Sequence, residues 1–572
     1  MGKTVTSSSQ CRPHTRAQQK SPQASRPHQK SRATQARHIA LGLLREIRRR
    51  DGYARDIIRS DSQVQKLSSR DKAFVLRLVL GVIITTGQLD ELLASHLAKP
   101  SRLKVQLRDA LRIAAYELCY MDTPAPAAIN QGVELVRSVG AYACGMANAV
   151  LRKIADIDAP RVTEARTHLM NWAAEKPAVV ENPSTAERPA EPEISSAAQM
   201  PAEPSDDLLA TLSLASGAPQ WLVRELYHSV GFHRACQLLA CLDEAAPVWV
   251  SANVLKSSSQ TTAALTALFS SLGEAVLPGV YRVYDVPALL NSAFVANSTL
   301  VVSDLAARMV CWITSPFAHS YVLEIGQGRA TKTLLLEDVA CQLGGPASIC
   351  GVDTHASKTK LAQKRLGIGA DNRAKSDAGN VAQPDADNSA FMPASPVFSP
   401  ETYLSCVTYD GRLLGAPSSQ LPEALQRDFD LVFVDAPCSG TGTLRRHPEI
   451  MWKLEPEDLD ATNPESLPAL QLALLRAAAT KVAPGGHLMY STCSVLQQEN
   501  EQVVEAFLQT EQGKYFELAP VADSNAFRVL AEQHPAAAQT LSDCIQHELF
   551  FRSYPQSGSF DGHFCARFVR VR

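Results

Sequence analysis

The sequence predicts a multidomain protein in which an all-α domain is followed by a small α+β subdomain and an α/β domain. Three observations predict this organisation. The length of 572 residues exceeds what a single hydrophobic core supports. Apolar residues recur at helical spacing from about residue 35 to residue 154, and from Tyr321 onward short β-rich runs alternate with helical stretches.

The all-α domain is expected at residues 35–158. Its apolar residues recur three and four positions apart in segments around 39–47, 74–82 and 107–118. Ser68 or Ser69 can cap the second of these helices, since Asp71 and Lys72 would then lie in its first turn.

A linker is expected at residues 159–207, followed by the small α+β subdomain at 208–300. The linker is inferred from residues 176–207, which are rich in Pro, Ala, Glu and Ser. They hold too few large apolar residues to offset the entropy of ordering.

The α/β domain is expected at residues 301–572. Its strands should cover residues 321–325, 349–353, 403–409, 430–435 and 486–491, and its helices residues near 332–342, 357–366, 467–482 and 499–509. Such alternation predicts a doubly wound parallel sheet. Residues 370–400, full of Ala, Asp, Asn, Ser and Pro, interrupt the alternation and are interpreted as a disordered surface insertion.

Residues 1–34 form a basic arm. From Met1 to Arg45 the chain has no Asp or Glu, whereas Lys and Arg recur, and the formal net charge of −2 conceals this asymmetry. The arm is either an unfolded strip that follows phosphates or a solvated tail with no partner. No apolar run reaches the roughly 18 residues that a membrane span needs. We therefore expect a cytoplasmic protein with no membrane partner.

The 13 cysteines include no Cys-x-x-Cys pair, which argues against a metal site and against a disulfide framework. Most are expected to be small buried hydrophobic residues. Cys438 and Cys493 differ, because each follows a predicted strand of the parallel sheet. Adjacent strands would bring both thiols to one edge, which makes a role as core filler a poor explanation for the pair.

A small-residue turn follows the first predicted strand of the α/β domain, where open parallel sheets bind ligands. Asp353 ends the second strand, where a carboxylate can accept hydrogen bonds from ribose hydroxyls, and Asp410 follows the third, placed to meet an adenine amino group. A pyrophosphate-binding Gly-x-Gly-x-x-Gly pattern is absent, which favours S-adenosylmethionine over NAD. The expected cofactor-binding residues are Gly326, Gln327, Gly328, Arg329, Ala330, Thr331, Lys332, Asp353, Asp410 and Asp435.

Two long motifs resemble the Sun/NOP family of RNA 5-methylcytosine methyltransferases. They read DAPCSGTGTLRRHPEIMW at 435–452 and YSTCSVLQQENEQVV at 490–504, and residues 410–412 and 561–566 fit further family motifs. The N-terminal part resembles the NusB RNA-binding fold through residues 70–74 and 148–152, among others. The resemblance implies a NusB-like domain, a small RNA-binding subdomain and a class I (Rossmann-like) methyltransferase domain. It also implies S-adenosylmethionine as cofactor and small-subunit (16S) ribosomal RNA as partner.

The same resemblance implies the catalytic roles. Cys493, from the later motif, would attack carbon 6 of a cytosine, Cys438 would aid product release, and Asp435 would stabilise charge at the nitrogen edge of the ring. The cofactor turn departs from the family's CAAPGGKT, since only Lys332 and the following threonine are kept. Ser251 stands where the family generally has Arg.

Two other functions remain open. One is an RNA-binding NusB-like protein with an inactive methyltransferase domain, which the altered turn favours. The other is a cytosine-5 methyltransferase that acts on transfer RNA. The retention of Asp435, Cys438 and Cys493 favours an enzyme, because a binding module has no chemical need for two thiols at one edge. We expect the protein to act as a monomer.

Overall fold

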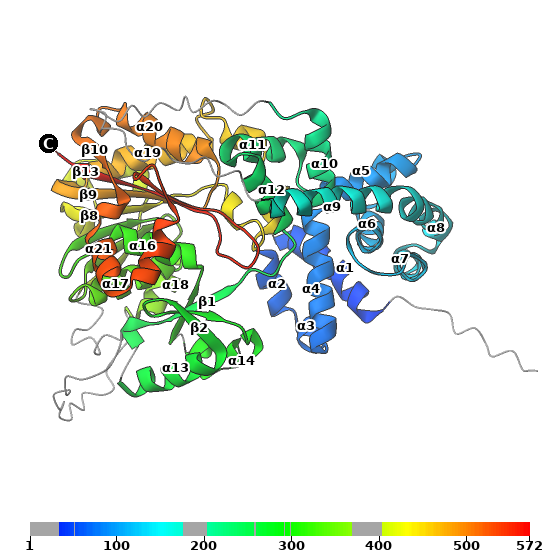
Figure 1. Ribbon diagram of the computed structural model, residues 1–572, viewed down its shortest axis with the longest axis horizontal. Helices are drawn as coiled ribbons and strands as arrows, with labels where there is room; N and C mark the ends of the chain where they lie inside the picture. The colour runs from blue at the N-terminus through cyan, green and yellow to red at the C-terminus, as the bar shows by residue number, and fades with distance from the viewer. Residues whose placement is uncertain are drawn as a thin grey trace, which may run out of the picture.

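The computed structural model describes residues 34–50, 52–175, 203–256, 259–290, 292–297, 299–368 and 403–571. The predicted insertion and all but the last residue of the predicted basic arm lie outside these residues. A helical domain lies on one side of the molecule and an α/β domain on the other, and a small sheet packs beside the latter (Figure 1).

The N-terminal helices pack around α6, whose residues are nearly all buried. The sequence forms these helices because its apolar residues keep one face over several turns. The predicted all-α domain is confirmed, and Ser68 is the cap that begins α4, because its hydroxyl accepts from the Asp71 N–H at 3.2 Å. The helices are α1 (Gln35–Arg50), α2 (Ala54–Ser60), α3 (Ser62–Gln65), α4 (Ser69–Ile84), α5 (Thr86–His96), α6 (Val105–Tyr120), α7 (Ala125–Val139) and α8 (Cys144–Lys153).

The expectation of a linker is wrong for its first part, because α9 occupies Ala159–Ala174. Val162, Ala165 and Leu169 form a buried face on this helix. This face packs against α10 (Asp206–Ser216) and α12 (Phe232–Ala240), with α11 (Gln220–Val230) beside them. The apolar spacing of α9 does not reveal this packing, because the partners of the helix come from a later part of the chain. Residues 176–202 lie outside the described ranges.

The small α+β subdomain has a four-stranded antiparallel sheet with the order β2-β3-β1-β4. It starts later than expected, because α10–α12 belong to the layer around α9, and its last strand passes residue 300. Ser251 is buried in β1, so this position does not offer a polar side chain to the surface. The elements are β1 (Val248–Ala252), α13 (Ser259–Leu272), β2 (Gly273–Leu277), β3 (Val280–Val283), α14 (Val286–Leu290), α15 (Ala293–Ala296) and β4 (Leu300–Ser303).

The α/β domain contains a nine-stranded sheet whose main order is β11-β12-β13-β9-β8-β5-β6-β7. The strands from β9 to β7 run parallel, as predicted. The C-terminal strands, for which the sequence predicted no orientation, pair antiparallel. Residues 554–562, which join β12 to β13, are too few for the helical crossover that a parallel pair needs. The strands are β5 (Tyr321–Ile325), β6 (Ser348–Asp353), β7 (Leu404–Thr408), β8 (Phe429–Asp435), β9 (Val482–Thr492), β10 (Phe516–Ala519), β11 (Ile545–Gln546), β12 (Phe550–Ser553) and β13 (His563–Arg570).

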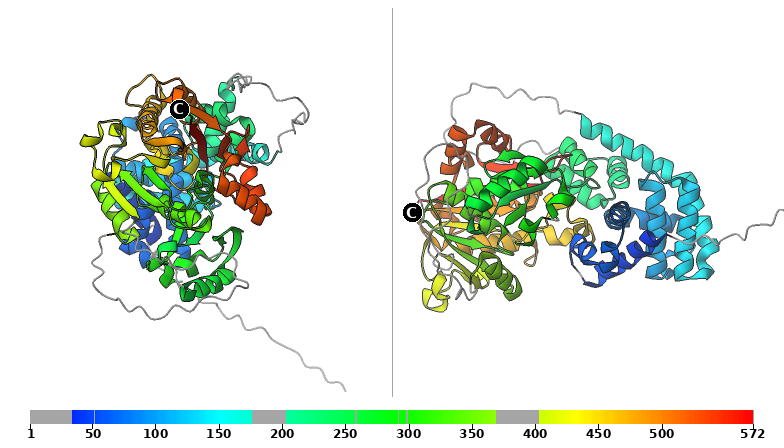
Figure 2. Two further views of the ribbon diagram at one scale, coloured as in Figure 1. Left: turned by 90° about the vertical axis from the view of Figure 1, so that its left-hand side faces the viewer. Right: turned by 90° about the horizontal axis from the view of Figure 1, so that it is seen from below.

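Helices cover both faces of this sheet, as the ribbon views show (Figures 1 and 2). One core lies under α16 (Leu305–Thr314), α17 (Thr331–Gln342), α18 (Ala356–Leu366), α21 (Asn525–Gln533) and α22 (Pro535–Ser542), and the other under α19 (Leu467–Ala479) and α20 (Glu501–Leu508). Because β5 lies between β8 and β6, the strand order reverses there. Ligands of open α/β sheets bind at the carboxyl ends of the strands beside such a reversal.

No single described helix is long and apolar enough to cross a membrane. Among the described helices, α4 and α5 pass the length and composition test when they are taken together, and they are joined at a bend of 76°. The apolar residues of both helices belong to the buried core of the helical domain.

Candidate active site

The turn after β5 has a left-handed backbone at three positions, which glycine adopts freely and alanine only at a cost. Gly326, Gly328 and Ala330 have positive φ angles of 87°, 57° and 59°. A Cβ atom on Gly326 would lie 2.2 Å from the Asp435 carbonyl oxygen, so this close approach to β8 requires glycine. A Cβ on Gly328 would meet only the Gly326 carbonyl at 3.8 Å and otherwise open space. The turn therefore leaves room for a ligand over Gly328.

Asp353 stabilises this turn from the end of β6. One carboxylate oxygen accepts from the Gly328 N–H at 3.1 Å, and the other accepts from the His355 N–H at 2.8 Å. Asp410 follows β7, and its carboxylate accepts from the backbone N–H of Arg412 at 3.0 Å and from its guanidinium at 2.6 Å. These bonds, the guanidinium bonds first, lower the pKa of Asp410. Both carboxylates are thus held at the ends of their strands.

Three of the predicted cofactor-binding side chains point away from the turn. The amide of Gln327 fills the space over Gly351, where a Cβ would lie 1.8 Å from its nitrogen. The guanidinium of Arg329 lies 3.7 Å from a carboxylate oxygen of Asp56 in α2. The Thr331 hydroxyl accepts from Arg365 at 2.7 Å. Because these side chains are engaged elsewhere, these three residues contribute only their backbone to the turn.

Lys332 pairs with Asp435 rather than contributing to the expected cofactor contacts. Its Nζ donates to Asp435 Oδ1 at 2.6 Å. Burial lowers the pKa of Lys332, but the attraction of Asp435, their hydrogen bond and the neighbouring Cys493 and Cys311 outweigh it and raise that pKa. The structure thus places a permanent positive charge beside Asp435 and Cys493.

Cys438 and Cys493 meet at the carboxyl ends of β8 and β9. Their sulfur atoms are 3.3 Å apart, and the Cys493 N–H points at the Cys438 sulfur, also at 3.3 Å. Both thiols are half-buried and free. The hydrogen bond with Cys493, followed by burial, raises the pKa of Cys438 well above its ordinary value. The structure brings together the two cysteines and the aspartate that the sequence predicts.

A buried polar network holds the loop that follows β8. Glu499 accepts from the Ser439 N–H at 2.7 Å and from the Gln471 amide at 3.0 Å, and the Tyr490 hydroxyl donates to the Glu499 carbonyl at 2.5 Å. Burial raises the pKa of the Glu499 carboxyl, although the bonds that it accepts oppose the rise. Glu499 belongs to the second long motif, but its position near Cys438 depends on the fold and was not predicted.

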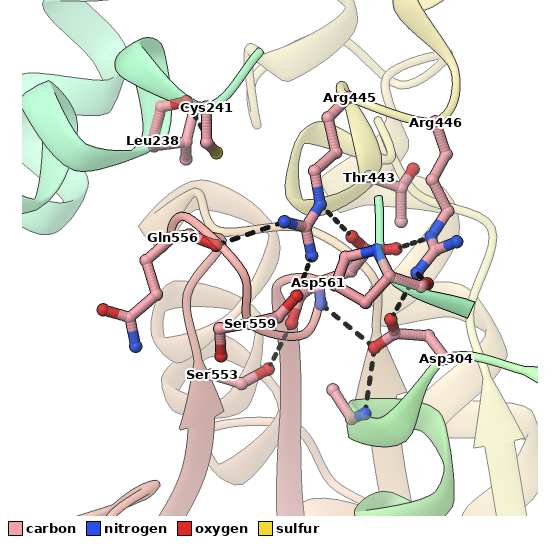
Figure 3. A network of polar contacts seen from close by, with 12 residues as sticks. Leu238, Cys241, Asp304, Thr443, Arg445, Arg446, Ser553, Gln556, Ser559 and Asp561 are labelled. Atoms are coloured by element: carbon pink, nitrogen blue, oxygen red, sulfur yellow. Dashed lines mark hydrogen bonds and ion pairs between the residues drawn. The ribbon is translucent and has the colours of Figure 1, made fainter. Parts of the chain in front are cut away.

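A second network surrounds Asp561 (Figure 3). Its carboxylate accepts from Arg445 Nε at 2.7 Å and also from Arg446 Nε. Arg446 further donates to Asp304 Oδ2 at 2.7 Å, and the Asp304 side chain caps the start of α16. Arg445 and Asp561 are each 1% exposed, so their charges compensate each other in a dry environment. The motif residues RRHP and DGHF gave no sign of this pairing, because ion-pair partners have no fixed sequence separation.

The fold and the site together define an α/β enzyme of the class I methyltransferase type, with two thiols at its catalytic edge. Residues 401–569 match the family of 16S rRNA methyltransferases RsmB/F, and residues 34–156 match the NusB family. The chain therefore combines a NusB-family domain with a methyltransferase domain of the RsmB/F family. This confirms the predicted resemblance.

Curated relatives align with this chain over most of their length. The probable ribosomal RNA small subunit methyltransferase B of Bacillus subtilis is 24% identical over 486 residues, covering 83% of this chain and 88% of the relative. The protein of the same description from Synechocystis is 27% identical and covers 83% and 89%. The crystal structure of PH0851 is similar in fold, with a TM-score of 0.57 at 18% identity, covering 93% of this chain and 98% of that one.

Proposed function

We propose that the protein transfers a methyl group from S-adenosylmethionine to carbon 5 of a cytosine in RNA, through a covalent bond between Cys493 and the base. The observation that carries the proposal is the 3.3 Å approach of two free thiols beside the Lys332–Asp435 pair. Carbon 5 of cytosine becomes nucleophilic only after a thiolate adds to carbon 6, and a second acid–base group must then complete the reaction.

Small-subunit ribosomal RNA is the proposed substrate. The similar proteins of Bacillus subtilis and Synechocystis carry that RNA in their names, and a NusB-family domain precedes the methyltransferase domain here. The residues at the β5 turn fit an adenosyl ligand, because Gly328 leaves open space and Asp353 holds a carboxylate at the end of β6. S-adenosylmethionine, when bound, supplies an electrophilic methyl group. Asp353 would accept from the ribose hydroxyls, and Asp410 would face the adenine.

Attack by Cys493 needs a thiolate, and the Lys332 ammonium is the neighbouring cation. The ammonium of Lys332 is already paired with Asp435, and Cys493 contributes to raising its pKa, so the two groups attract each other when the sulfur is ionised. Addition of this thiolate to carbon 6 moves electron density into the ring. Asp435, held by Lys332, would share a proton with the nitrogen edge of the ring, and the hydrogen bond that it donates in its protonated form would stabilise that charge.

Release is assigned to Cys438. In the covalent state the Cys493 sulfur is bonded to carbon 6, so it no longer acts as the neighbour that raises the pKa of Cys438. A Cys438 thiolate then takes the proton from carbon 5, the electrons of that C–H bond form the carbon 5–carbon 6 double bond, and Cys493 leaves as a thiolate.

Removal of each thiol should therefore block a different step of the reaction. Cys493→Ala should abolish methyl transfer and give no protein–RNA adduct. Cys438→Ala should still attack and transfer, so that RNA accumulates on the protein. Denaturing gels after incubation with S-adenosylmethionine and either ribosomal or transfer RNA measure both outcomes.

The opposite pattern of adducts would reverse the two roles. No adduct with either variant, together with no S-adenosylmethionine binding by the intact protein in a titration, would support an RNA-binding protein with an inactive methyltransferase domain. An adduct with transfer RNA but not with ribosomal RNA would mean that transfer RNA is the substrate.

A further inference from the structure

A helix of the N-terminal domain contacts the loop that carries Cys438. We call residues 436–447, which follow β8, the catalytic loop. From α2, Arg55 Nε donates to the Arg446 carbonyl at 3.0 Å, and a terminal nitrogen of Arg55 donates to the Arg445 carbonyl, also at 3.0 Å. These partners are 391 and 390 positions away in the sequence. The contact therefore joins two domains.

Arg55 serves this contact at an electrostatic cost. Burial, followed by repulsion from Arg446, lowers the pKa of the Arg55 guanidinium. The attraction of Glu449 and Asp561 opposes this shift but does not outweigh it, and within the described ranges Arg55 has no carboxylate within ion-pair distance. Its charge is satisfied by two backbone carbonyls, which a planar guanidinium can reach together because its N–H groups form a rigid fork.

Further contacts beside Arg55 hold the start of α2 against residues 447–449. The Ala54 N–H donates to Glu449 at 3.4 Å, and the rings of Tyr53 and His447 have centroids 4.7 Å apart. On the next residue of α2, Asp56 lies 3.7 Å from Arg329 in the cofactor turn. One short helix of the N-terminal domain thus touches both loops of the site.

Hydrogen bonds continue from the Arg55 contact to the thiols. The side chains of Arg445 and Arg446 hold the far side of the catalytic loop through Asp561. Within the loop, the Gly442 N–H donates to the Cys493 carbonyl at 2.9 Å, and the Gly442 carbonyl accepts from the Gly562 N–H at 2.9 Å. The loop is therefore fixed on three sides, and Arg55 provides hydrogen bonds that link it to the N-terminal domain, beside the contact of Tyr53 with His447.

We propose that Arg55 is a positioning residue for methyl transfer, through which the N-terminal domain fixes the catalytic loop and the approach of Cys438 to Cys493. The N-terminal domain then does more than bind RNA, because it completes the geometry of a site made by the other domain. This inference rests on the proposed function. Displacement of reacting groups by about 1 Å can lower a rate by roughly 100-fold, so loss of this link should be measurable in turnover.

The test compares Arg55→Ala with Arg59→Ala in the full chain. Arg59 lies on the same helix and is 75% exposed, and among the described residues its side chain pairs with Asp56 on its own helix at 3.1 Å, so its loss removes the same charge without removing a contact to the catalytic loop. Arg55→Ala should lower kcat about 10- to 100-fold with KM for RNA nearly unchanged, and Arg55→Lys, which can reach one carbonyl, should recover part of the loss. Arg59→Ala should keep the kcat of the original chain.

A second readout does not depend on methylation. The rates at which iodoacetamide modifies Cys438 and Cys493 without RNA, measured by mass spectrometry, should rise in Arg55→Ala and not in Arg59→Ala, because the loop loosens. Equal increases of KM in both variants with unchanged kcat would show that Arg55 only attracts RNA. A lower melting temperature with unchanged kcat and unchanged alkylation would show that it only docks the domains. If the original chain fails to methylate RNA, the proposed function fails, and the alkylation rates still decide the role of Arg55.

Discussion

The sulfur atoms of Cys438 and Cys493 lie 3.3 Å apart, although 55 residues separate them in the sequence. The pair forms because β8 and β9 are parallel neighbours, and Asp435, the last residue of β8, is paired in register with Ser491, two residues before Cys493. At this separation the ionisation of one thiol changes that of the other. A change at either cysteine is therefore expected to alter the chemistry of the other.

Removal of Cys493 should make Cys438 more reactive. The largest cause of the raised pKa of Cys438 is its hydrogen bond with Cys493, which Cys493→Ala abolishes. More Cys438 thiolate is then present at about pH 8, so its alkylation by iodoacetamide should be faster than in the original chain. Peptide mass spectrometry measures the rate, and the half-buried Cys144 in the helical domain is the internal control. Unchanged alkylation of Cys438 would contradict this explanation of its pKa.

The two glycines of the cofactor turn should tolerate alanine unequally. Gly326→Ala would place a Cβ atom 2.2 Å from the Asp435 carbonyl, so β5 and β8 must separate and S-adenosylmethionine binding should fall by more than tenfold. Gly328→Ala meets open space and costs only the positive φ of 57°, about 1–2 kcal/mol. Isothermal titration calorimetry with S-adenosylmethionine compares the two variants. Equal losses would mean that the turn, and not its approach to β8, limits binding.

The ion pair of Asp561 with Arg445 should matter far more to stability than a surface pair. Asp561→Asn leaves a guanidinium that is 1% exposed without its counter-charge, which should cost about 3–5 kcal/mol. Asp410→Asn breaks a pair whose arginine is 55% exposed, and should cost no more than about 1 kcal/mol. The midpoint of urea unfolding measures both, and similar midpoints for the two variants would contradict the role assigned to Asp561.

The sequence predicted the central sheet and the thiols for a physical reason. Buried parallel strands such as β8 contain continuous apolar runs, here residues 431–434, and functional residues follow them at the carboxyl edge. The approach of Cys438 to Cys493 could thus be predicted from the sequence alone. The acids Asp353 and Asp410 were found by the same rule.

Other features had no local signature in the sequence. The face of α9 has its partners beyond residue 203, so a neighbouring low-complexity stretch outweighed it in the prediction. The partner of Lys332 could not be predicted, because a lysine after a small-residue turn fits a cofactor contact equally well. The contact of Arg55 could not be predicted from the sequence, because its acceptors are backbone carbonyls, which every residue has.

The last prediction concerns Glu324, which is fully buried in β5 beside the site. Burial raises the pKa of its carboxyl from 4.5 to about 8, and one of its oxygens lacks a hydrogen-bond partner within the described structure. Between pH 4.5 and pH 8 the folded protein therefore binds a proton that the unfolded chain has lost. The contribution of Glu324 is fully present below pH 4.5 and is lost as the pH rises to about 8, with a slope of at most about 1.4 kcal/mol per pH unit.

Glu324→Gln removes this titration, so the stability of the variant relative to the original chain should increase steadily from pH 5 to pH 8 and then level off. Urea midpoints at several pH values measure the difference. Glu511→Gln is the matched control, because its side chain is 84% exposed and the same chemical change should not alter the pH dependence. A difference between Glu324→Gln and the original chain that stays constant from pH 5 to pH 8 would mean that Glu324 is not protonated in the folded protein.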